Sequence, residues 1–563
     1  MRTATFALIL LAVTACRADH TGAAGTDGGT MVITAPADAD GFLPPITASG
    51  PSQQVEQQIF ERLAEPGPKM NTYGDAGFVP ALATGWTWSR DSLSIAFHID
   101  PRARWHDGPA VTARDVRFSL DLYRDSTIGS VTRPLLASID SVTAPDSLTA
   151  VFWFSRRYPE QFFDATYQMR ILPEHLLAQI PRKDIPTSPF VRQPVGSGPF
   201  KFVRWDEHQS VVIEANPGYH LGRPHLDRVI WSNAPDPNAA ALRLLSGEAD
   251  FLEYLRPGDF AEVAKHPEVR AVYYPDFSFG YLLFNLRDPK RPAAPHPLFA
   301  DRELRRALTM LVDRQAVVTS VFDSLAIVGH GPVTRNYPTY DSTIALLPYA
   351  PDSASKLLDA LGWKRGPDGM RVKGGRPLAF TLTVPTSSAT RRNMAVLLQE
   401  IFKKAGVKVE IEQLDFATFY RRMLHHDFDA AMSVTLLDPS AGNLRQTWGS
   451  TAAGPAEGNW GSYVSPAFNA DVDSALRQMD FAKARAYFKR AYETIIGDAP
   501  AIWIYEPFSY AGIQRRIHPA GMRPDGWYAD IREWYIPAGE RTARDRAATL
   551  PAPPPASAAP AKP

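Results

Sequence analysis

The chain has 563 residues, of which 45% are hydrophobic and 21% are charged. At about 150 residues per domain, this length predicts three or four globular units, and the composition excludes a single small module and a disordered chain. Sixty Lys and Arg residues balance sixty Asp and Glu residues, so no net field attracts polyanions and nucleic acid is not an expected partner.

The N-terminal segment contains the only cysteine of the chain, Cys16. Counting therefore excludes disulfides within the chain and metal sites built from cysteines. Arg2 precedes an apolar run over residues 4–11, and small residues lie directly before Cys16, as in a bacterial lipobox. We expect residues 1–15 to be a lipoprotein signal peptide, Cys16 to carry a thioether-linked lipid, and residues 16–29 to be a flexible tether. The alternative is an ordinary signal peptide cleaved beyond a chance cysteine, and both interpretations predict export.

The first half of the chain alternates strand-like and helix-like segments, which predicts an α/β architecture. Apolar and polar residues alternate over residues 95–99, as in a strand, and Thr112 and Asp115 fit a capping box that opens a helix. Residues 200–205 and 211–213 flank a short polar turn, as in a β-hairpin. A helix is expected over residues 238–246, with Leu242 and Leu245 facing inward.

The second half has clearer periodicity. Apolar residues at helical spacing follow Asp301, a candidate N-cap, and a second helix is expected from about Asp352 to Gly362. Strand-like alternation over residues 378–384, an apolar helical face over 394–401 and renewed alternation over 407–411 predict a βαβ unit with parallel strands. The Pro- and Ala-rich end, residues 541–563, predicts a disordered tail.

Two patterns are compatible with chemistry, and each has a simpler structural interpretation. Ser353 and Lys356 have the SxxK spacing of serine acyl-transferring enzymes, but no Ser-Asp-Asn triplet follows, and an amphipathic helix accounts for the same residues. His425 and His426 are adjacent, so on a helix they diverge by about 100° and do not face one metal ion. A solvated helix end is the simpler interpretation of this pair. We expect no catalytic residue, no metal and no cofactor.

Several segments resemble, in their order, the family 5 solute-binding proteins of ABC importers, which include dipeptide- and oligopeptide-binding lipoproteins. The segments are Pro80–Trp86, Trp105–Val116, Pro194–Phe200, Asn216–Tyr219, Leu244–Asp250 and Lys404–Ile411. The resemblance spans about residues 31–535. One such segment would carry little information, whereas several in one order over most of the chain are specific.

The resemblance implies a two-lobed α/β fold of the periplasmic-binding-protein type (type II, Venus flytrap), with an extra α+β domain on the first lobe. The first lobe would combine residues 28–53, 195–282 and 508–540. The added domain would cover residues 54–194, and the second lobe would cover residues 283–507. A ligand would bind between the lobes, which would close about a hinge.

The resemblance also implies ligand-binding positions. They are Phe42 and Leu43 in an early turn of the first lobe, and Thr435, Asp438, Trp460, Trp503 and Tyr505 in the second lobe. Peptide receptors of this family carry an aspartate for the ligand's α-amino group at the position that Thr435 occupies here. The nearest carboxylate is Asp438, three residues later. Because a buried ammonium needs a charged partner, this departure leaves peptide specificity open.

The function implied is that of an extracytoplasmic receptor, a lipid-anchored monomer that delivers a peptide or peptide-sized solute to ABC permease subunits. Its location would be the periplasmic face or the cell surface. The same clamp for an oligosaccharide or a metal chelate is an alternative that the sequence does not separate. An exported serine hydrolase built on Ser353 and Lys356 is the alternative from another class.

Overall fold

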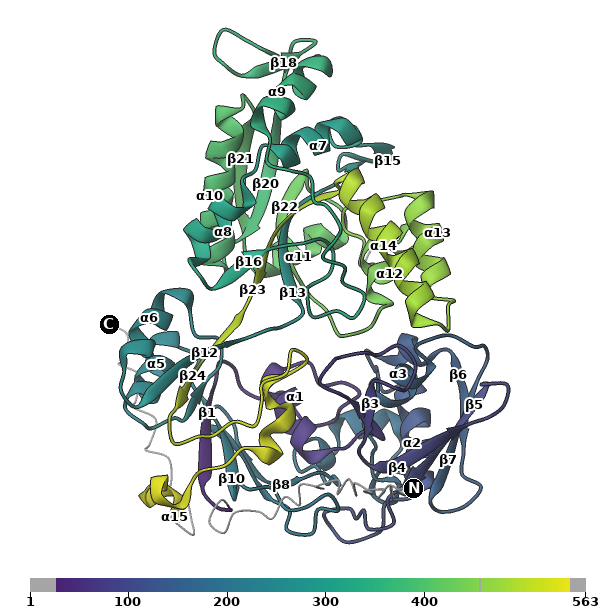
Figure 1. Cartoon of the computed structure of the whole chain (residues 1–563). Coiled ribbons are helices and arrows are strands. Elements are labelled where there is room, and N and C mark those ends of the chain that lie inside the picture. The colour runs from purple at the N-terminus through teal and green to yellow at the C-terminus, as the bar shows by residue number, and fades with distance from the viewer. Residues whose placement is uncertain (1–26, 455–456, 547–563) are drawn as a thin grey trace, which may run out of the picture.

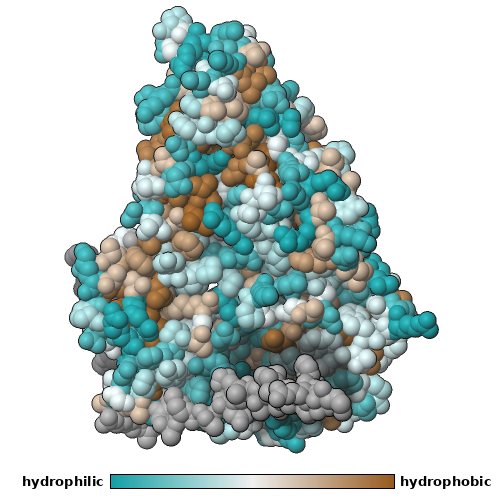
Figure 2. All heavy atoms as spheres, in the orientation of Figure 1, coloured by the Kyte–Doolittle hydropathy of each residue, from teal (hydrophilic) through white to brown (hydrophobic). Residues whose placement is uncertain are grey.

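The computed structural model describes residues 27–454 and 457–546. The predicted signal peptide, the lipidation site Cys16 and most of the predicted tether lie outside the described residues. Figure 1 shows a wide base, made by two neighbouring parts, and a second body above it. The space-filling view has the same outline, which widens from the upper body toward the base (Figure 2).

The first lobe is built on a seven-stranded sheet in the order β12-β24-β11-β1-β10-β9-β8. Its strands are β1 (Thr30–Ala35), β8 (Phe200–Asp206), β9 (Ser210–Ala215), β10 (Arg228–Asn233), β11 (Phe251–Leu252), β12 (Val269–Tyr274) and β24 (Ser509–Gln514). Its helices are α1 (Gly50–Ile59), α5 (Pro237–Leu245), α6 (Pro257–Lys265) and α15 (Ala543–Arg546). Every residue of β1 is buried, because this strand lies inside the sheet, parallel to both β10 and β11.

The added part of the base contains a four-stranded antiparallel sheet in the order β4-β5-β7-β6. Its strands are β2 (Ala64–Pro66), β3 (Phe78–Pro80), β4 (Ala83–Trp88), β5 (Ser94–Ile99), β6 (Ile139–Thr143) and β7 (Thr149–Phe154), and its helices are α2 (Ala113–Arg124), α3 (Gln161–Thr166) and α4 (Glu174–Leu177). The strand expected over residues 95–99 is confirmed. The expected helix start is confirmed as well, since the Asp115 carboxylate accepts hydrogen bonds from the Thr112 amide and hydroxyl at 2.8 and 2.9 Å.

The second lobe is built on a six-stranded sheet in the order β16-β23-β13-β22-β20-β21. Its strands are β13 (Ser278–Phe284), β16 (Ala326–Val328), β20 (Ala379–Pro385), β21 (Lys408–Leu414), β22 (Ala430–Leu436) and β23 (Ala501–Pro507), and short strands flank them: β14 (Arg287–Asp288), β15 (Arg291–Pro295), β17 (Lys364–Arg365), β18 (Arg371–Lys373) and β19 (Arg376–Pro377). Its helices are α7 (Arg302–Met310), α8 (Arg314–Phe322), α9 (Pro351–Ala360), α10 (Ala389–Lys404), α11 (Phe416–Leu424), α12 (Asn443–Trp448), α13 (Pro466–Ala475) and α14 (Phe481–Asp498).

Both faces of this second sheet are covered by helices. Leu282 and Phe284 of β13 join one apolar core with α7, α8, α9 and α10, whereas Tyr281 and Leu283 join another with α11 to α14. This is the alternation expected of a strand, whose successive side chains point to opposite faces. The predicted α/β, two-lobed fold class is confirmed.

The predicted βαβ unit of the second half is also confirmed. Strands β20 and β21 pair in parallel, with Leu382 opposite Ile411, and α10 connects them. The helix buries Met394 and Leu398 against the sheet. Asp301 caps α7 as expected, because its carboxylate accepts the amides of Glu303 and Leu304.

Three expectations need correction. Leu242 was expected to face inward, but it is 66% exposed; Ala240 and Leu244 are the buried residues of α5, and Leu245 packs partly buried against the core as expected. His426 is buried rather than solvated, and its ring contacts the Trp460 carbonyl and the Ser462 hydroxyl. Residues 541–546 belong to the folded body rather than to a tail.

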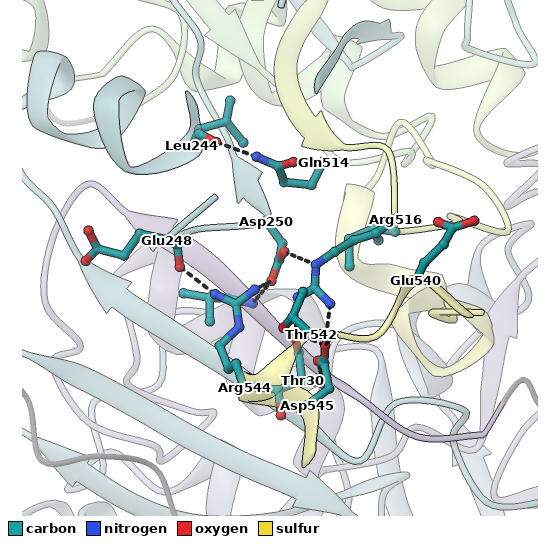
Figure 3. Close-up of polar contacts among 12 residues, drawn as sticks. Thr30, Leu244, Glu248, Asp250, Gln514, Arg516, Glu540, Thr542, Arg544 and Asp545 are labelled. Atoms are coloured by element: carbon teal, nitrogen blue, oxygen red, sulfur yellow. Dashed lines mark hydrogen bonds and ion pairs between the residues drawn. The ribbon is translucent and has the colours of Figure 1, made fainter. Parts of the chain in front are cut away.

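The last described helix, α15, is held by ion pairs shown in Figure 3. The Asp545 carboxylate accepts hydrogen bonds from the Thr30 amide and from Arg516, both at 2.7 Å. Arg544 and Arg516 in turn bind the fully buried carboxylate of Asp250, at 2.6 and 2.8 Å. This network joins the first strand of the sheet to the last helix.

The chain passes between the two large sheets at two places, from β12 to β13 and from β23 to β24. Asp276 lies in the first crossing. One of its carboxylate oxygens accepts the Ser278 amide and hydroxyl, and the other accepts the hydroxyl of Ser509, which begins β24 after the second crossing. One carboxylate therefore ties the two connections together.

Candidate functional site

A cavity of about 520 Å³ lies where the first lobe, the added part and the second lobe meet. The first lobe contributes Thr47, Glu56, Glu253 and Trp527, the added part Arg62, Tyr123 and Arg170, and the second lobe Leu436, Leu437 and Asp438. Asp276 and Ser509 of the two crossings complete the wall. The volume lies within the range typical of small-molecule sites, about 300–1,000 Å³.

Of the seven predicted ligand-binding residues, Asp438 alone is among those that line this cavity. It is half-buried at the end of β22, and its Oδ1 accepts hydrogen bonds from the Ser440 amide and the Asn443 side chain at 2.9 and 2.6 Å. Burial raises the pKa of Asp438, while these hydrogen bonds and nearby Arg62 partly lower it. Asp438 is thus oriented by its own loop.

Thr435 does not line the cavity. Its hydroxyl is 2.8 Å from the Tyr281 hydroxyl on the neighbouring strand β13. The two residues that follow it, Leu436 and Leu437, do line the cavity, and Leu436 is 72% exposed. The second lobe therefore presents apolar side chains where the resemblance implies a charged one.

Phe42 and Leu43 are completely buried. Phe42 packs edge-on against Trp205 at 5.5 Å between ring centroids, inside the first lobe. The next residue, Pro44, lines the cavity instead. The early turn does reach the cavity, but its aromatic residue is part of the core.

The three predicted aromatic residues of the second lobe are also away from the cavity. Trp503 is buried against Trp448, and Tyr505 is buried against Phe322. Trp460 is partly buried, with its ring edge-on to Tyr420. Large aromatic residues are packed more often than they are functional, and these three follow that rule.

Three arginines that the sequence analysis did not single out lie on the wall formed by the added part and the end of the first lobe. Arg62 pairs with Glu65 at 3.0 Å and lies 4.0 Å over the ring of Tyr167. Arg523 pairs with Asp525 at 2.8 Å. Arg170 is buried, and its guanidinium donates to the Phe60 carbonyl and the Gln57 side chain at 3.0 and 3.1 Å.

Buried carboxyl groups lie on the wall of the first lobe. Glu253 accepts a hydrogen bond from Gln54 at 2.6 Å, and burial raises its pKa to about 7. Glu56 accepts a hydrogen bond from the Thr47 hydroxyl at 2.6 Å, and burial raises its pKa to about 8. Burial also raises the pKa of Asp276. Desolvation is the largest cause in each case, because a carboxylate loses hydration when it is buried.

The added part also contacts the second lobe directly, beside the cavity. Glu160 precedes α3, and its buried carboxylate accepts hydrogen bonds from the Ser440 hydroxyl and from the amides of Ala441 and Gly442, at 2.8–3.1 Å. The Thr72 hydroxyl donates to the Pro439 carbonyl at 3.0 Å. These contacts hold the loop that follows Asp438.

Only a weak sequence pattern indicates that Arg170 belongs to the cavity. Arg170 interrupts an apolar segment between Met169 and Ile171, both of which are buried. A charged residue inside such a segment is rarely buried without a functional or structural partner. No periodic pattern identifies Arg62 or Glu253, because the fold brings them together from separate segments.

Ser353 and Lys356, on which the alternative function of a serine hydrolase would depend, do not line the cavity. Ser353 and Lys356 are exposed on α9, which lies at the end of the second lobe far from the base in Figure 1. Over residues 27–454 and 457–546, no group of three or more His, Cys, Asp or Glu side chains is placed to hold a metal ion. No helix within the same ranges has the length and apolar character needed to cross a bilayer.

The chain is similar to known proteins over most of its length. The model of the bacterial extracellular solute-binding proteins, family 5, matches residues 77–456. The oligopeptide-binding protein AppA of Bacillus subtilis is 26% identical over 524 residues, covering 90% of this chain and 92% of AppA.

Solved structures have the same fold. AppA of Bacillus subtilis in complex with a nonapeptide superposes with a TM-score of 0.74 at 24% identity, covering 91% of this chain and 99% of AppA. The substrate-binding protein CtaP of Listeria monocytogenes has a TM-score of 0.80 at 22% identity, with 91% and 99% covered. NikZ of Campylobacter jejuni in complex with Ni(L-His) has a TM-score of 0.74 at 22% identity, with 90% and 99% covered.

This family consists of solute-binding proteins rather than enzymes, and its extracellular character implies export. The match covers more than half of the chain and includes most of the added part, a stretch of the first lobe and much of the second lobe. The chain belongs to the bacterial extracellular solute-binding proteins of family 5.

Proposed function

We propose that the protein is the receptor of an ABC importer, which binds a peptide or peptide-sized solute in the cavity between its lobes and delivers it to the permease. The observation that carries this proposal is the cavity itself, which is lined by both lobes and by the two crossings. A ligand that contacts both lobes stabilises the closed arrangement, so the shape of the protein depends on whether a ligand is bound. The peptide-binding relatives support the choice of ligand.

Several finer features belong to the same proposal. The first lobe would combine about residues 28–59, 195–277 and 508–546, the added domain about 60–194 and the second lobe about 278–507, which moves the expected boundaries so that α1, β13 and α15 stay whole. Cys16 would carry the lipid that holds a monomer at the membrane. Replacing Cys16 by Ser is expected to move the exported protein from the membrane fraction to the soluble fraction, and an unchanged distribution would contradict the anchor.

A metal chelate is the second candidate ligand, since NikZ, a structural relative, was solved with Ni(L-His). Among the residues that the structure describes, the cavity is lined by carboxyl groups of both lobes and by no histidine. This composition favours an organic ligand held by charged groups over a histidine-assisted chelate.

Native mass spectrometry of the protein purified from its own cells tests the proposal. We expect an adduct whose masses form a peptide series and whose components are released unchanged. An adduct of another class would contradict the peptide, and conversion of added peptides would contradict a receptor that leaves its ligand intact.

A further inference from the structure

The added part holds the second lobe through a surface that we call the clasp, made of residues 67–77 between β2 and β3 together with Glu160. It lies where α3 of the base meets the ends of α13 and α14 (Figure 1). Met70 and Tyr73 of this loop are 1% and 6% exposed, and both belong to the apolar core of the second lobe. The Tyr73 hydroxyl donates to the Ala475 carbonyl at 2.8 Å. Opening of the lobes would withdraw both side chains from this core.

Glu160 continues the surface formed by the loop. The Gly74 amide donates to the Pro159 carbonyl at 2.9 Å, which joins the loop to the residue before Glu160. Both oxygens of the Glu160 carboxyl group face the second lobe. Its Oε1 accepts the Ala441 amide at 2.8 Å, and its Oε2 accepts the Ser440 hydroxyl at 2.9 Å. Closure of the lobes therefore removes this carboxyl group from water.

Closing the clasp gathers three acidic side chains. Burial raises the pKa of Glu160, of Asp164 on α3 and of Asp438 on the second lobe, and Asp438 raises the pKa of both others further. Arg62 and Arg156 lower the pKa of Asp438 and Asp164 in part. Within residues 27–454 and 457–546, no cation is paired with Glu160. A charged Glu160 therefore opposes closure.

The remaining titratable groups that face Glu160 are tyrosines. Tyr73 comes from the added part and Tyr337 from the second lobe. Burial raises the pKa of both hydroxyls, and the negative charge of Glu160 adds to this effect. Both tyrosines are therefore neutral near pH 7 and supply no positive charge. A proton on Glu160 itself is the remaining way to neutralise it.

The contacts of Glu160 accommodate such a proton. Its Oε2 faces the Ser440 hydroxyl, which can accept a hydrogen bond as well as donate one. The Gly442 amide, 3.1 Å from Oε2, has a second acceptor in the Ser440 hydroxyl oxygen at 3.0 Å. The Ala441 amide stays on Oε1. A protonated Glu160 can thus keep its contacts with the second lobe without burying a negative charge.

From these contacts we infer that the clasp makes closure of the lobes depend on pH, because it engages together with uptake of a proton by Glu160. The inference rests on the proposed function, whose closure it regulates.

The direction of this dependence follows from the two arrangements of Glu160. In the open arrangement water hydrates the carboxylate, so its pKa is close to the ordinary value of 4.5, whereas burial in the clasp raises it to about 7. The closed form therefore binds the proton more tightly. Closure is favoured in mildly acidic surroundings, and this contribution is lost as the pH rises through 7.

The test follows the lobes directly and needs no ligand. In the chain from residue 16 onward, Cys16→Ser removes the only cysteine. Arg90→Cys in the added part and Ala470→Cys on α13, both at exposed positions, then carry a pair of dyes. Single-molecule energy transfer between the dyes gives the ratio of closed to open protein. We expect this ratio to be at least tenfold higher at pH 5.5 than at pH 8.

Variants assign this response to the clasp. In Glu160→Gln, which keeps an acceptor but does not titrate, the ratio is expected to change less than threefold between the two pH values. Glu174→Gln removes a carboxylate that pairs with Arg114 inside the added part, and it should respond like the wild type. Because each protein is compared with itself and only folded molecules are counted, partial unfolding of a variant does not affect the result.

Two outcomes overturn the inference. One is an equal response in the wild type and in Glu160→Gln, and the other is a wild type whose ratio is the same at both pH values. Neither outcome contradicts the peptide receptor, because the native mass spectrometry described above tests the ligand independently of pH.

Discussion

Among single residues, Glu56 shows how burial makes the stability of the protein depend on pH. Its side chain is 3% exposed, and its pKa is raised from 4.5 to about 8. The folded protein therefore binds the proton more tightly than the unfolded chain does. The contribution to stability is fully present below about pH 4.5 and is lost as the pH rises toward 8.

Glu56→Gln is expected to remove this contribution. Between pH 5 and pH 8 the free energy of unfolding of the wild type should fall by about 3–4 kcal/mol more than that of the variant. Urea unfolding at several pH values measures the difference. Glu248→Gln, at an exposed carboxylate, is the matched control. Parallel pH profiles for wild type and Glu56→Gln would show that the carboxyl group is not buried in this way.

Single residues also show which parts of the site can be predicted from the sequence and which cannot. Asp438 was predicted from the family resemblance of the segment that contains it, and this segment does reach the cavity. Trp503 and Tyr505 lie on β23, a strand covered on both faces, where neither side of the alternation faces a ligand. Arg62, Arg170 and Glu253 have no shared pattern, because three separate segments place them around one cavity.

Among elements, the segment before α3 connects the added part to the second lobe through Glu160. Removing its carboxylate takes the acceptor from the Ala441 amide and the Ser440 hydroxyl, and one of two acceptors from the Gly442 amide. A hydrogen bond contributes about 0.5–1.5 kcal/mol, and about 1.5–3 kcal/mol where one partner is charged; burial raises the pKa of Glu160 to about 7. Part of this free energy favours the closed arrangement, since the contacts join two parts of the molecule.

Glu160→Ala is therefore expected to weaken ligand binding about tenfold or more without changing the preference among ligands. Calorimetry with a mixed-sequence library of peptides three to five residues long measures the change. Glu174→Ala removes an ion pair with Arg114 inside the added part and is the control. Unchanged affinity in Glu160→Ala would mean that the contact does not contribute to closure.

The helix α15 is a second element with a defined energetic role. Asp545 is fully buried at its side chain and joins Arg516 to the amide of Thr30. Asp545→Asn is expected to lower the free energy of unfolding by about 1–3 kcal/mol, because it leaves Arg516 with a weaker partner. Chemical unfolding measures the loss. Glu540→Gln, at an exposed pair with His518, should have little effect, and an equal loss in both variants would contradict the role assigned to Asp545.

The elements themselves were largely predictable where their pattern is local. The strand–helix–strand unit over 378–411 and the caps at Asp301 and Thr112 depend on neighbouring residues, and they were found. The orientation of α5 was not, because Leu242 and Leu244 are both apolar and only packing against the first sheet decides which is buried.

At the scale of the whole molecule, the two crossings and the cavity between the lobes predict a change of shape on binding. Small-angle scattering is expected to show a smaller radius of gyration when a bound peptide is present than after it has been removed. Ser509→Ala removes one of the bonds that tie the crossings through Asp276, and it should alter the distribution of shapes in the ligand-free protein. Identical scattering curves with and without ligand would contradict closure about these crossings.

The order of strands in the first sheet also bears on biosynthesis. Strand β24 lies between β11 and β12, and the carboxylate of Asp545 holds the amide of Thr30 in β1. The sheet thus lacks an interior strand until residue 514 has left the ribosome, and such distant pairings form slowly. The first sheet therefore cannot complete its folding while most of the chain is being synthesised. This delay suits a protein that must be exported before it folds.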